Sequence, residues 1–356
     1  MAFVGRLAYG PSWPQRITRL VMKQVLISQR IVTEFAPRLH GILAAAPRPV
    51  EILPFTKDLG VAPGDLPAIE AAYYSRDIWE GTVKNDLTPA ARAFWDIADR
   101  APNLKWLAVY SAGTDQQRYQ DAMKRGIRLT TSAGAQAESV GLAAIAGILA
   151  LGRRLPHWLS SQHAAAWAPL RGKDIPPDMP GQTAVIVGTG YIGKVVARVL
   201  HAMGMKTIGI RRSRAPMAHF DRVLPLSELD TVLPACDWLV LAAPLVPETR
   251  DLMDKRRLAL LPPTAGLANV ARGELIDEPA LAEALAAGRL RCAYLDVFTV
   301  EPLPPESPFW RLPNVLISPH NAGASTGTYG RGVEIFLRNL ENYLAARPLE
   351  NEASPD

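Results

Sequence analysis

The sequence predicts an α/β protein with two doubly wound parallel sheets, of the Rossmann and flavodoxin-like type, and a cleft between the two domains. Three observations support this fold class. Short apolar segments rich in β-branched residues alternate with helical patterns along most of the chain, as they do in doubly wound sheets. One segment, residues 183–200, joins a strand, a glycine-rich turn and a helix. The chain has 356 residues, which is enough for two separate hydrophobic cores.

The first domain begins after an atypical N-terminal segment. Residues 1–21 carry arginines, glycines and prolines but no acid, and we expect a disordered or extra extension there. From Lys23 onward the pattern becomes regular, and the clearest helix covers residues 88–101. The expected strands are residues 24–27, 50–54, 70–74, 106–110 and 128–131. A long apolar helix is expected at residues 135–151, followed by a loop rich in His, Trp and Pro that runs to Pro180.

The second domain repeats the alternation. Its first strand opens at Thr183, and helices are expected at residues 226–233, 255–261 and 279–287. The further strands are residues 206–210, 238–243, 266–270, 291–295 and 315–318. The last helix, residues 326–346, has no strand after it, so we expect the chain to return to the first domain. The predicted division is therefore 22–133 with 324–356 for one domain and 134–323 for the other.

The glycines after the strand at Thr183 predict a dinucleotide site. Gly188, Gly190 and Gly193 have the spacing G-x-G-x-x-G between a strand and a helix. Gly188 permits a tight turn, Gly190 permits close approach of a pyrophosphate, and Gly193 permits close packing of helix on strand. The amides of the helix N-terminus attract phosphate. We expect Tyr191 and Ile192, which lie between the last two glycines, to belong to the same site.

The residues after the next strand indicate which dinucleotide binds. An acid there usually holds the ribose 2′-hydroxyl of NAD, but this chain has Arg211, Arg212, Ser213 and Arg214. Guanidinium groups match a 2′-phosphate in charge and geometry. The alternative is a solvated basic loop. Because the loop should meet the adenosine ribose, we expect NADP(H) to be preferred, with NAD(H) possible.

Composition limits the remaining possibilities. The net charge of +5 is mild, and we find no nucleic-acid motif. Cys236 and Cys292 lie far apart in apolar runs, which predicts buried free thiols and no metal site. No apolar run reaches membrane-spanning length, so we expect a soluble, cytoplasmic protein without membrane contacts.

Three further segments carry a family resemblance. They are NVARGELID at 269–277, LDVFTVEPL at 295–303 and SPHNAG at 318–323. Together with the glycine motif they resemble the D-isomer-specific 2-hydroxyacid dehydrogenase family, from about Met22 to the C-terminal helix. Within that family, EPLPPESPFW at 301–310 and the arginines after the second strand are most similar to glyoxylate and hydroxypyruvate reductases.

Three residues of these segments have the chemistry that reduction of a 2-keto acid needs. Arg272 follows the fourth strand at the carboxyl edge of the sheet, where its guanidinium can bind a carboxylate or polarise the keto oxygen. His320 follows the sixth strand at the same edge, and histidine exchanges protons near neutral pH. Glu301 can hydrogen-bond the imidazole and stabilise its protonated form. Taken alone, His320 could be a packed or surface histidine, Arg272 part of a turn and Glu301 part of an exposed loop. Together the three predict the catalytic set that the resemblance also assigns.

The resemblance implies further contacts. Asp296 would meet the nicotinamide carboxamide, although a strand-end cap is the alternative, and Pro244 with Leu245 would line the nicotinamide pocket. The amides of Ala112 and Gly113 would hold the substrate carboxylate together with Arg272 and His320, unless that loop is an ordinary tight turn. Asn321 departs from the family, where an apolar residue is common.

The predicted function is the reversible reduction of a small 2-keto acid, glyoxylate or hydroxypyruvate, to a D-2-hydroxy acid with NADPH. The resemblance implies a homodimer, for which residues 135–151 and the loop around Trp158 and Trp167 are the candidate interface. One alternative is an NAD-dependent dehydrogenase for another acid. A second alternative is a non-catalytic protein that senses NADP(H), against which the complete set of Arg272, Glu301 and His320 argues.

Overall fold

The computed structural model describes residues 23–58, 61–80 and 87–353, and the extension predicted at residues 1–21 lies outside them. The described residues form two compact units. One contains the chain up to Ala135 together with the segment from Thr326 on, and the other is Gln136–Ser325. Each unit has its own parallel sheet and hydrophobic cores on both faces of that sheet.

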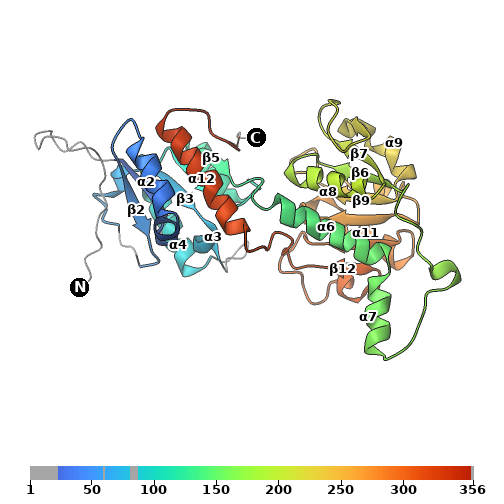
Figure 1. Cartoon of the computed structure of the whole chain (residues 1–356). Helices are drawn as coiled ribbons and strands as arrows, with labels where there is room; N and C mark the ends of the chain where they lie inside the picture. Colours follow the sequence, from blue (N-terminus) through green and yellow to red (C-terminus); the bar gives the residue numbers. More distant parts are fainter. Residues whose placement is uncertain (1–22, 59–60, 81–86, 354–356) are drawn as a thin grey trace, which may run out of the picture. The chain divides into compact units, whose positions relative to one another are not determined.

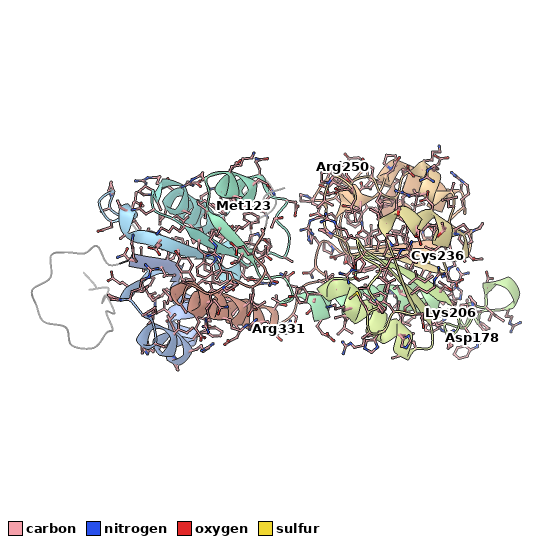
Figure 2. The ribbon with its side chains drawn as sticks, turned by 90° about the horizontal axis from the view of Figure 1, so that it is seen from above. Met123, Asp178, Lys206, Cys236, Arg250 and Arg331 are labelled. Carbon is pink, nitrogen blue, oxygen red and sulfur yellow. The ribbon has the colours of Figure 1, made fainter. Side chains whose placement is uncertain are left out.

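The first unit is built on five parallel strands in the order β2-β1-β3-β4-β5. Figure 1 labels β2, β3 and β5 of this sheet. The strands are β1 (Lys23–Ser28), β2 (Val50–Phe55), β3 (Ile69–Tyr74), β4 (Trp106–Val109) and β5 (Arg128–Thr131). One face packs against α1 (Gln29–Glu34), α2 (Ala36–Ala44) and α12 (Thr328–Leu344), and the other against α3 (Arg76–Trp79), α4 (Pro89–Arg100) and α5 (Gln117–Lys124). Figure 2 shows the two faces through Met123 of α5 and Arg331 of α12, which lie on opposite sides of the sheet.

The C-terminal helix α12 is anchored to this sheet by apolar and polar contacts. Phe336 stacks on Tyr73 and Trp106, with ring centroids 4.4 and 5.5 Å apart. Tyr343 donates a hydrogen bond of 2.8 Å to the buried carboxylate of Glu70, at the second position of β3. Arg48 binds the same carboxylate at 2.5 Å. Burial raises the pKa of Glu70, but the hydrogen bonds from Arg48 and Tyr343 outweigh it and lower the pKa to about 2.

The depressed pKa of Glu70 predicts how stability depends on pH. Because the folded-state pKa lies below the unfolded value, the contribution is complete above about pH 4.5 and is lost as the pH falls toward 2. Glu70→Gln should therefore lower the free energy of unfolding at pH 7 by about 2–3 kcal/mol, and the deficit should shrink below pH 4.5. Urea unfolding at several pH values measures it. Glu341→Gln, which removes an exposed acid of α12, should cost under about 1 kcal/mol. A deficit for Glu70→Gln that does not change with pH would contradict the prediction.

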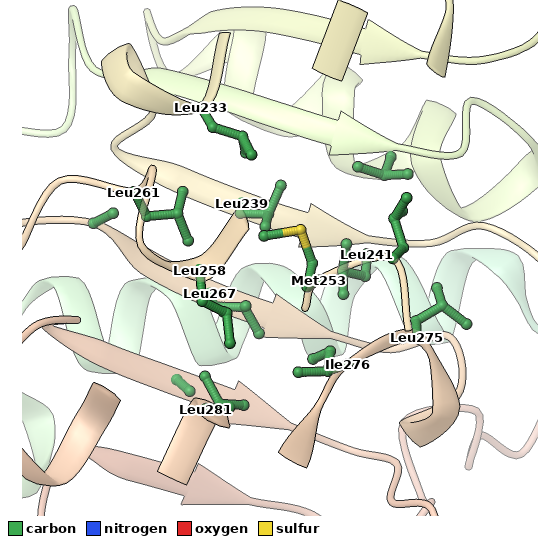
Figure 3. Close-up of a cluster of buried hydrophobic side chains, with 14 of the residues drawn as sticks. Leu233, Leu239, Leu241, Met253, Leu258, Leu261, Leu267, Leu275, Ile276 and Leu281 are labelled. Carbon is green, nitrogen blue, oxygen red and sulfur yellow. The ribbon is translucent and has the colours of Figure 1, made fainter. Parts of the chain in front are cut away.

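The second unit holds seven parallel strands in the order β12-β11-β10-β9-β6-β7-β8. The strands are β6 (Thr183–Val187), β7 (Lys206–Ile210), β8 (Arg222–Leu224), β9 (Trp238–Leu241), β10 (Gly266–Asn269), β11 (Cys292–Leu295) and β12 (Val315–Ile317). Helices α6 (Ala137–Gly152) and α8 (Tyr191–Ala202) cover one face. The other face packs against α9 (Leu229–Val232), α10 (Lys255–Leu258) and α11 (Glu278–Ala286). Figure 3 shows part of the hydrophobic core between the sheet and α9, α10 and α11. In it, Leu239 and Leu267 of the sheet lie beside Met253 and Leu281.

The predicted fold class is confirmed, since both units are α/β layers around a parallel sheet. Several elements differ from the prediction. The helix predicted at residues 226–233 is only the four-residue α9, between two 3-10 turns, and the helix predicted at residues 255–261 ends at Leu258. The short edge strand β8 follows β7 in the chain, so β9 is the fourth strand of the sheet. The loop expected up to Pro180 contains the helix α7 (Leu155–His163), which begins with a proline in its first turn, where proline is tolerated.

Two smaller observations complete the fold. Cys236 and Cys292 are buried and free of disulfide bonds, as predicted. No single helix in the described ranges is long and apolar enough to cross a membrane, whereas the bent pair α6 and α7 meets that test by length and composition alone.

Candidate active site

The glycine-rich turn lies where the strand order of the second sheet reverses. β6 pairs with β7 on one side and β9 on the other, and ligands of such sheets bind at this point beyond the carboxyl ends of the strands. Gly188 has a φ of +94°, and a Cβ there would lie 2.5 Å from the carbonyl oxygen of Ala242, directly after β9. The turn therefore requires glycine at this position both for its conformation and for its close approach to the neighbouring strand.

The other two glycines have different surroundings. A Cβ at Gly193 would lie 2.0 Å from the carbonyl oxygen of Gly188, so this glycine allows α8 to pack against the turn. A Cβ at Gly190 would meet no described heavy atom within 4 Å, and no side chain in the described part of the chain caps α8. Open space beside uncapped helix amides fits a pyrophosphate. Tyr191 is exposed and Ile192 half-buried at the start of α8, and Pro244 is exposed after β9.

The four polar residues after β7 differ in how they are held. Arg211 is half-buried and its guanidinium lies 3.0 Å from the sulfur of Met217. Arg214 forms an ion pair with Glu228. Arg212 and Ser213 are exposed, and the structure gives Arg212 no ion pair with any described residue. The charge of this loop fits a phosphate on the adenosine ribose of a dinucleotide. Arg212 is the arginine of the loop that is most available for such a contact.

Arg272 is positioned by a short turn after β10. The buried side chain of Asn269 accepts from the amide of Ala271 at 3.0 Å and donates to the carbonyl of Arg272 at 2.8 Å. Arg272 is half-buried and donates to the carbonyl oxygen of Ala271 at 2.7 Å. The next residue, Gly273, would place a Cβ 2.0 Å from the carbonyl carbon of Phe298. Glycine at 273 thus brings the arginine turn against the segment that leads from β11 to Glu301.

This close approach makes Gly273 a sensitive position. Gly273→Ala should destabilise the second unit by about 3 kcal/mol or more, because the new methyl group overlaps backbone atoms of Phe298 and Thr299, which would have to shift. Thermal unfolding measures the loss. Gly41→Ala, in α2 with no heavy atom near the new methyl group, is the matched control and should be neutral or stabilising. Equal unfolding temperatures for Gly273→Ala and the wild type would refute the packing argument.

Glu301 and His320 are hydrogen-bonded to each other. Nδ1 of His320 lies 2.7 Å from one carboxylate oxygen of Glu301, and the other carboxylate oxygen accepts from the amide of Phe298 at 3.0 Å. The Glu301 side chain is 21% exposed and that of His320 is 50% exposed. An ionised carboxylate can only accept, so Nδ1 carries a proton in this hydrogen bond, and Nε2 is the ring nitrogen that Glu301 leaves available.

Asp296 is buried and its carboxylate binds the loop that carries His320. Oδ1 accepts from the hydroxyl of Ser318 at 2.5 Å and from the amides of Asn321 and Ala322 at 2.9 and 3.0 Å. Among the described residues, Oδ2 accepts only from the amide of Ala322, at 3.2 Å. The carboxylate therefore caps this loop, which was the alternative to a nicotinamide contact, while Oδ2 retains capacity for one more donor such as a carboxamide.

Comparison with known proteins identifies the family to which the chain belongs. Residues 145–322, half of its length, match the family model described as D-isomer specific 2-hydroxyacid dehydrogenase, NAD binding domain. A glyoxylate reductase from Thermofilum pendens is 35% identical over 254 residues, which are 69% of this chain and 73% of the relative. The chain belongs to the D-isomer-specific 2-hydroxyacid dehydrogenase family.

Solved structures agree with this membership. A D-isomer specific 2-hydroxyacid dehydrogenase family protein from Aeromonas salmonicida subsp. salmonicida has 29% identity and a TM-score of 0.75, covering 94% of this chain and 99% of that one. An NADPH-dependent glyoxylate/hydroxypyruvate reductase from Sinorhizobium meliloti, in complex with NADP and malonate, has 26% identity and a TM-score of 0.66, covering 94% and 97%. The predicted family and the predicted class, an NAD(P)-dependent 2-keto acid reductase, are confirmed.

In this dehydrogenase, the three residues of the predicted catalytic set follow three adjacent strands. Arg272 follows β10, Glu301 follows β11 and His320 follows β12. The predicted substrate loop belongs to the first unit, after β4. There Ala112 is exposed and Gly113 half-buried, and Ser111 donates to the carbonyl of Gly113 at 3.1 Å.

Sequence reasoning missed four residues that shape this site. They are Asn269, Gly273, Ser318 and Tyr294, whose hydroxyl lies 2.8 Å from that of Ser318. An asparagine at a strand end and a glycine directly after Arg272 were the available signals for the first two, because both residue types favour turns. The contacts of Tyr294 and Ser318 have no local pattern that could have indicated them.

Proposed function

We propose that this dehydrogenase uses NADPH to reduce, reversibly, glyoxylate to glycolate or hydroxypyruvate to D-glycerate. The observation that carries the proposal is the 2.7 Å hydrogen bond between Glu301 and His320. The same sheet carries, after β6, a glycine turn that fits a dinucleotide. Support also comes from the glyoxylate reductase of Thermofilum pendens and the NADPH-dependent enzyme of Sinorhizobium meliloti.

The proposed catalytic roles follow from charge and hydrogen-bonding capacity. Nε2 of His320 donates the proton to the keto oxygen during reduction and accepts it in the reverse direction, while Glu301 keeps the ring oriented and its cationic form stabilised. Arg272 holds the substrate carboxylate or polarises the keto oxygen through a forked pair of hydrogen bonds. A bound nicotinamide cofactor would supply the hydride for C2. That the amides of Ala112 and Gly113 also hold the carboxylate stays a prediction.

Preference for NADPH is proposed from the basic residues after β7. Arg212→Ala should lower the ratio of kcat/KM with NADPH to kcat/KM with NADH by about tenfold or more, because an exposed guanidinium is a strong partner for the 2′-phosphate. Arg211→Asp should lower it further by adding a repulsive charge. Arg222→Ala, an exposed arginine at the start of β8, is the matched control. An unchanged ratio in both loop variants would place the 2′-phosphate elsewhere.

A homodimer is proposed through the α6–α7 region. Trp158 and Leu159 of α7 are 48% and 55% exposed, Trp167 in the following loop is 97% exposed, and Leu142 of α6 is 48% exposed. Large apolar side chains gathered in neighbouring segments are typical of an interface. Sedimentation should show a dimer, and Trp158→Glu with Trp167→Glu should shift it to monomer.

Steady-state kinetics test the proposed substrate. Glyoxylate, hydroxypyruvate, pyruvate and phenylpyruvate are each reduced with NADPH and with NADH. We expect the highest kcat/KM for one of the first two acids with NADPH. Faster turnover of phenylpyruvate, or with NADH, would favour the alternative of an NAD-dependent dehydrogenase for another acid.

A further inference from the structure

His320 adopts a backbone conformation that needs external support. Its φ is +50°, in the left-handed region that residues with a Cβ adopt only at a cost of about 1–2 kcal/mol. It lies in the turn after β12, and its side chain is half exposed. Conformations of this kind persist at functional sites when surrounding contacts fix them.

One buried residue fixes this turn from both sides. The carbonyl oxygen of Asp296 accepts from the amide of His320 at 2.8 Å. Its carboxylate binds Ser318 two residues before the histidine and the amides of Asn321 and Ala322 just after it. The histidine is therefore flanked on both sides by groups that Asp296 holds in place.

A third side chain completes the connection to the sheet. The hydroxyl of Tyr294, in β11, lies 2.8 Å from the hydroxyl oxygen of Ser318. Ser318 has a single hydroxyl proton, and the buried carboxylate of Asp296 can only accept it. Tyr294 must therefore be the donor to Ser318, which gives a directed chain from Tyr294 through Ser318 to Asp296. Burial raises the pKa of Tyr294, so the phenol keeps the proton that this chain requires.

An independent observation shows that the ring of Tyr294 has a dedicated place. Gly147 lies inside α6, and a Cβ there would be 2.3 Å from Cγ of Tyr294. Glycine in a helix interior costs about 1 kcal/mol relative to alanine. Here it leaves the space in which the tyrosine ring packs against the helix and aims its hydroxyl at Ser318.

We infer that Tyr294, Ser318 and Asp296 are positioning residues for His320, acting through one directed hydrogen-bond chain that holds the histidine turn in its left-handed form. The inference rests on the proposed function, in which His320 exchanges the proton. It assigns to Ser318 and Tyr294 a part in the reaction that acts through His320.

The decisive variant is Ser318→Ala, which interrupts the chain without adding bulk. We expect kcat for the best keto acid to fall tenfold or more, while the KM for the acid and the Kd for NADPH stay within about twofold. Ser318→Thr keeps the hydroxyl and should restore most of the loss. Tyr294→Phe should give a smaller decrease, because Ser318 still donates to Asp296. Ser325→Ala, an exposed serine of the same unit, is the matched control and should match the wild type.

Hydrogen exchange of the chain without cofactor gives a second readout that does not depend on turnover. Amides of residues 320–322 should exchange about tenfold faster in Ser318→Ala than in the wild type, with other segments unchanged. Unchanged exchange, or a kcat within twofold of wild type, would overturn the inference while leaving the proposed function intact. If the wild type reduced no keto acid, the proposed function would fail, and the exchange rates would still decide whether the chain holds the turn.

Discussion

His320→Gln should lower kcat for keto-acid reduction by about a thousandfold and change the Kd for NADPH by less than twofold. General acid catalysis by a positioned side chain contributes typically 10²- to 10⁴-fold, and glutamine keeps a hydrogen-bond donor but cannot exchange a proton. Cofactor affinity should persist because the glycine turn follows β6, whereas His320 follows β12 at the far edge of the sheet. Stopped-flow fluorescence and steady-state kinetics measure the two quantities separately.

The matched control for this variant is His201→Gln. His201 lies in the last turn of α8 with its side chain 46% exposed, close to the exposure of His320. The His201→Gln variant should have the same kcat as the wild type. If His320→Gln lost cofactor affinity in the same proportion as kcat, the residue would be structural for the cofactor site, and its role as proton donor would have to be abandoned.

Arg272→Ala should lower kcat/KM by a hundredfold to a thousandfold, mostly through a higher KM for the keto acid. Truncating one partner of a desolvated charge pair costs about 2–5 kcal/mol, and the half-buried guanidinium is the cation that the turn after β10 delivers to the site. Arg272→Lys should recover only part of the loss, since an ammonium supplies the charge without the planar fork.

Arg250→Ala controls for the removal of an arginine as such. Arg250 is exposed in the second unit (Figure 2) and should tolerate the change with wild-type kinetics. Full activity of Arg272→Lys would show that charge alone suffices and would contradict the forked contact. Wild-type kcat/KM in Arg272→Ala would show that Arg272 does not bind the keto acid.

Much of the fold could be predicted because most strands are short runs of apolar or β-branched residues with clear ends. The predicted strands 128–131 and 206–210 agree with β5 and β7 at both ends. The glycine turn was also readable, since strand, turn and helix follow one another without a gap. The edge strand β8 has three residues, too few for a period-2 pattern. The helix α7 has no buried residue, so its apolar side chains show no core-facing stripe.

Contacts between distant segments account for the features of the site that the sequence did not predict. Glu228 pairs with Arg214 across 14 residues, and this pairing leaves Arg212 as the more available cation of the loop. Asp296 reaches Asn321 and Ala322 across 25 and 26 residues. Such partners depend on which strands the sheet places side by side, and no local pattern in the sequence encodes them.

Isotope transfer tests the central claim most directly. Hydroxypyruvate is reduced with NADPH that carries deuterium at the transferable C4 position, and the product is analysed by mass, NMR and chiral chromatography. The account predicts D-glycerate with deuterium at C2, because hydride adds to the keto carbon while His320 supplies only the hydroxyl proton. Product without deuterium at C2, or of the L configuration, would contradict it.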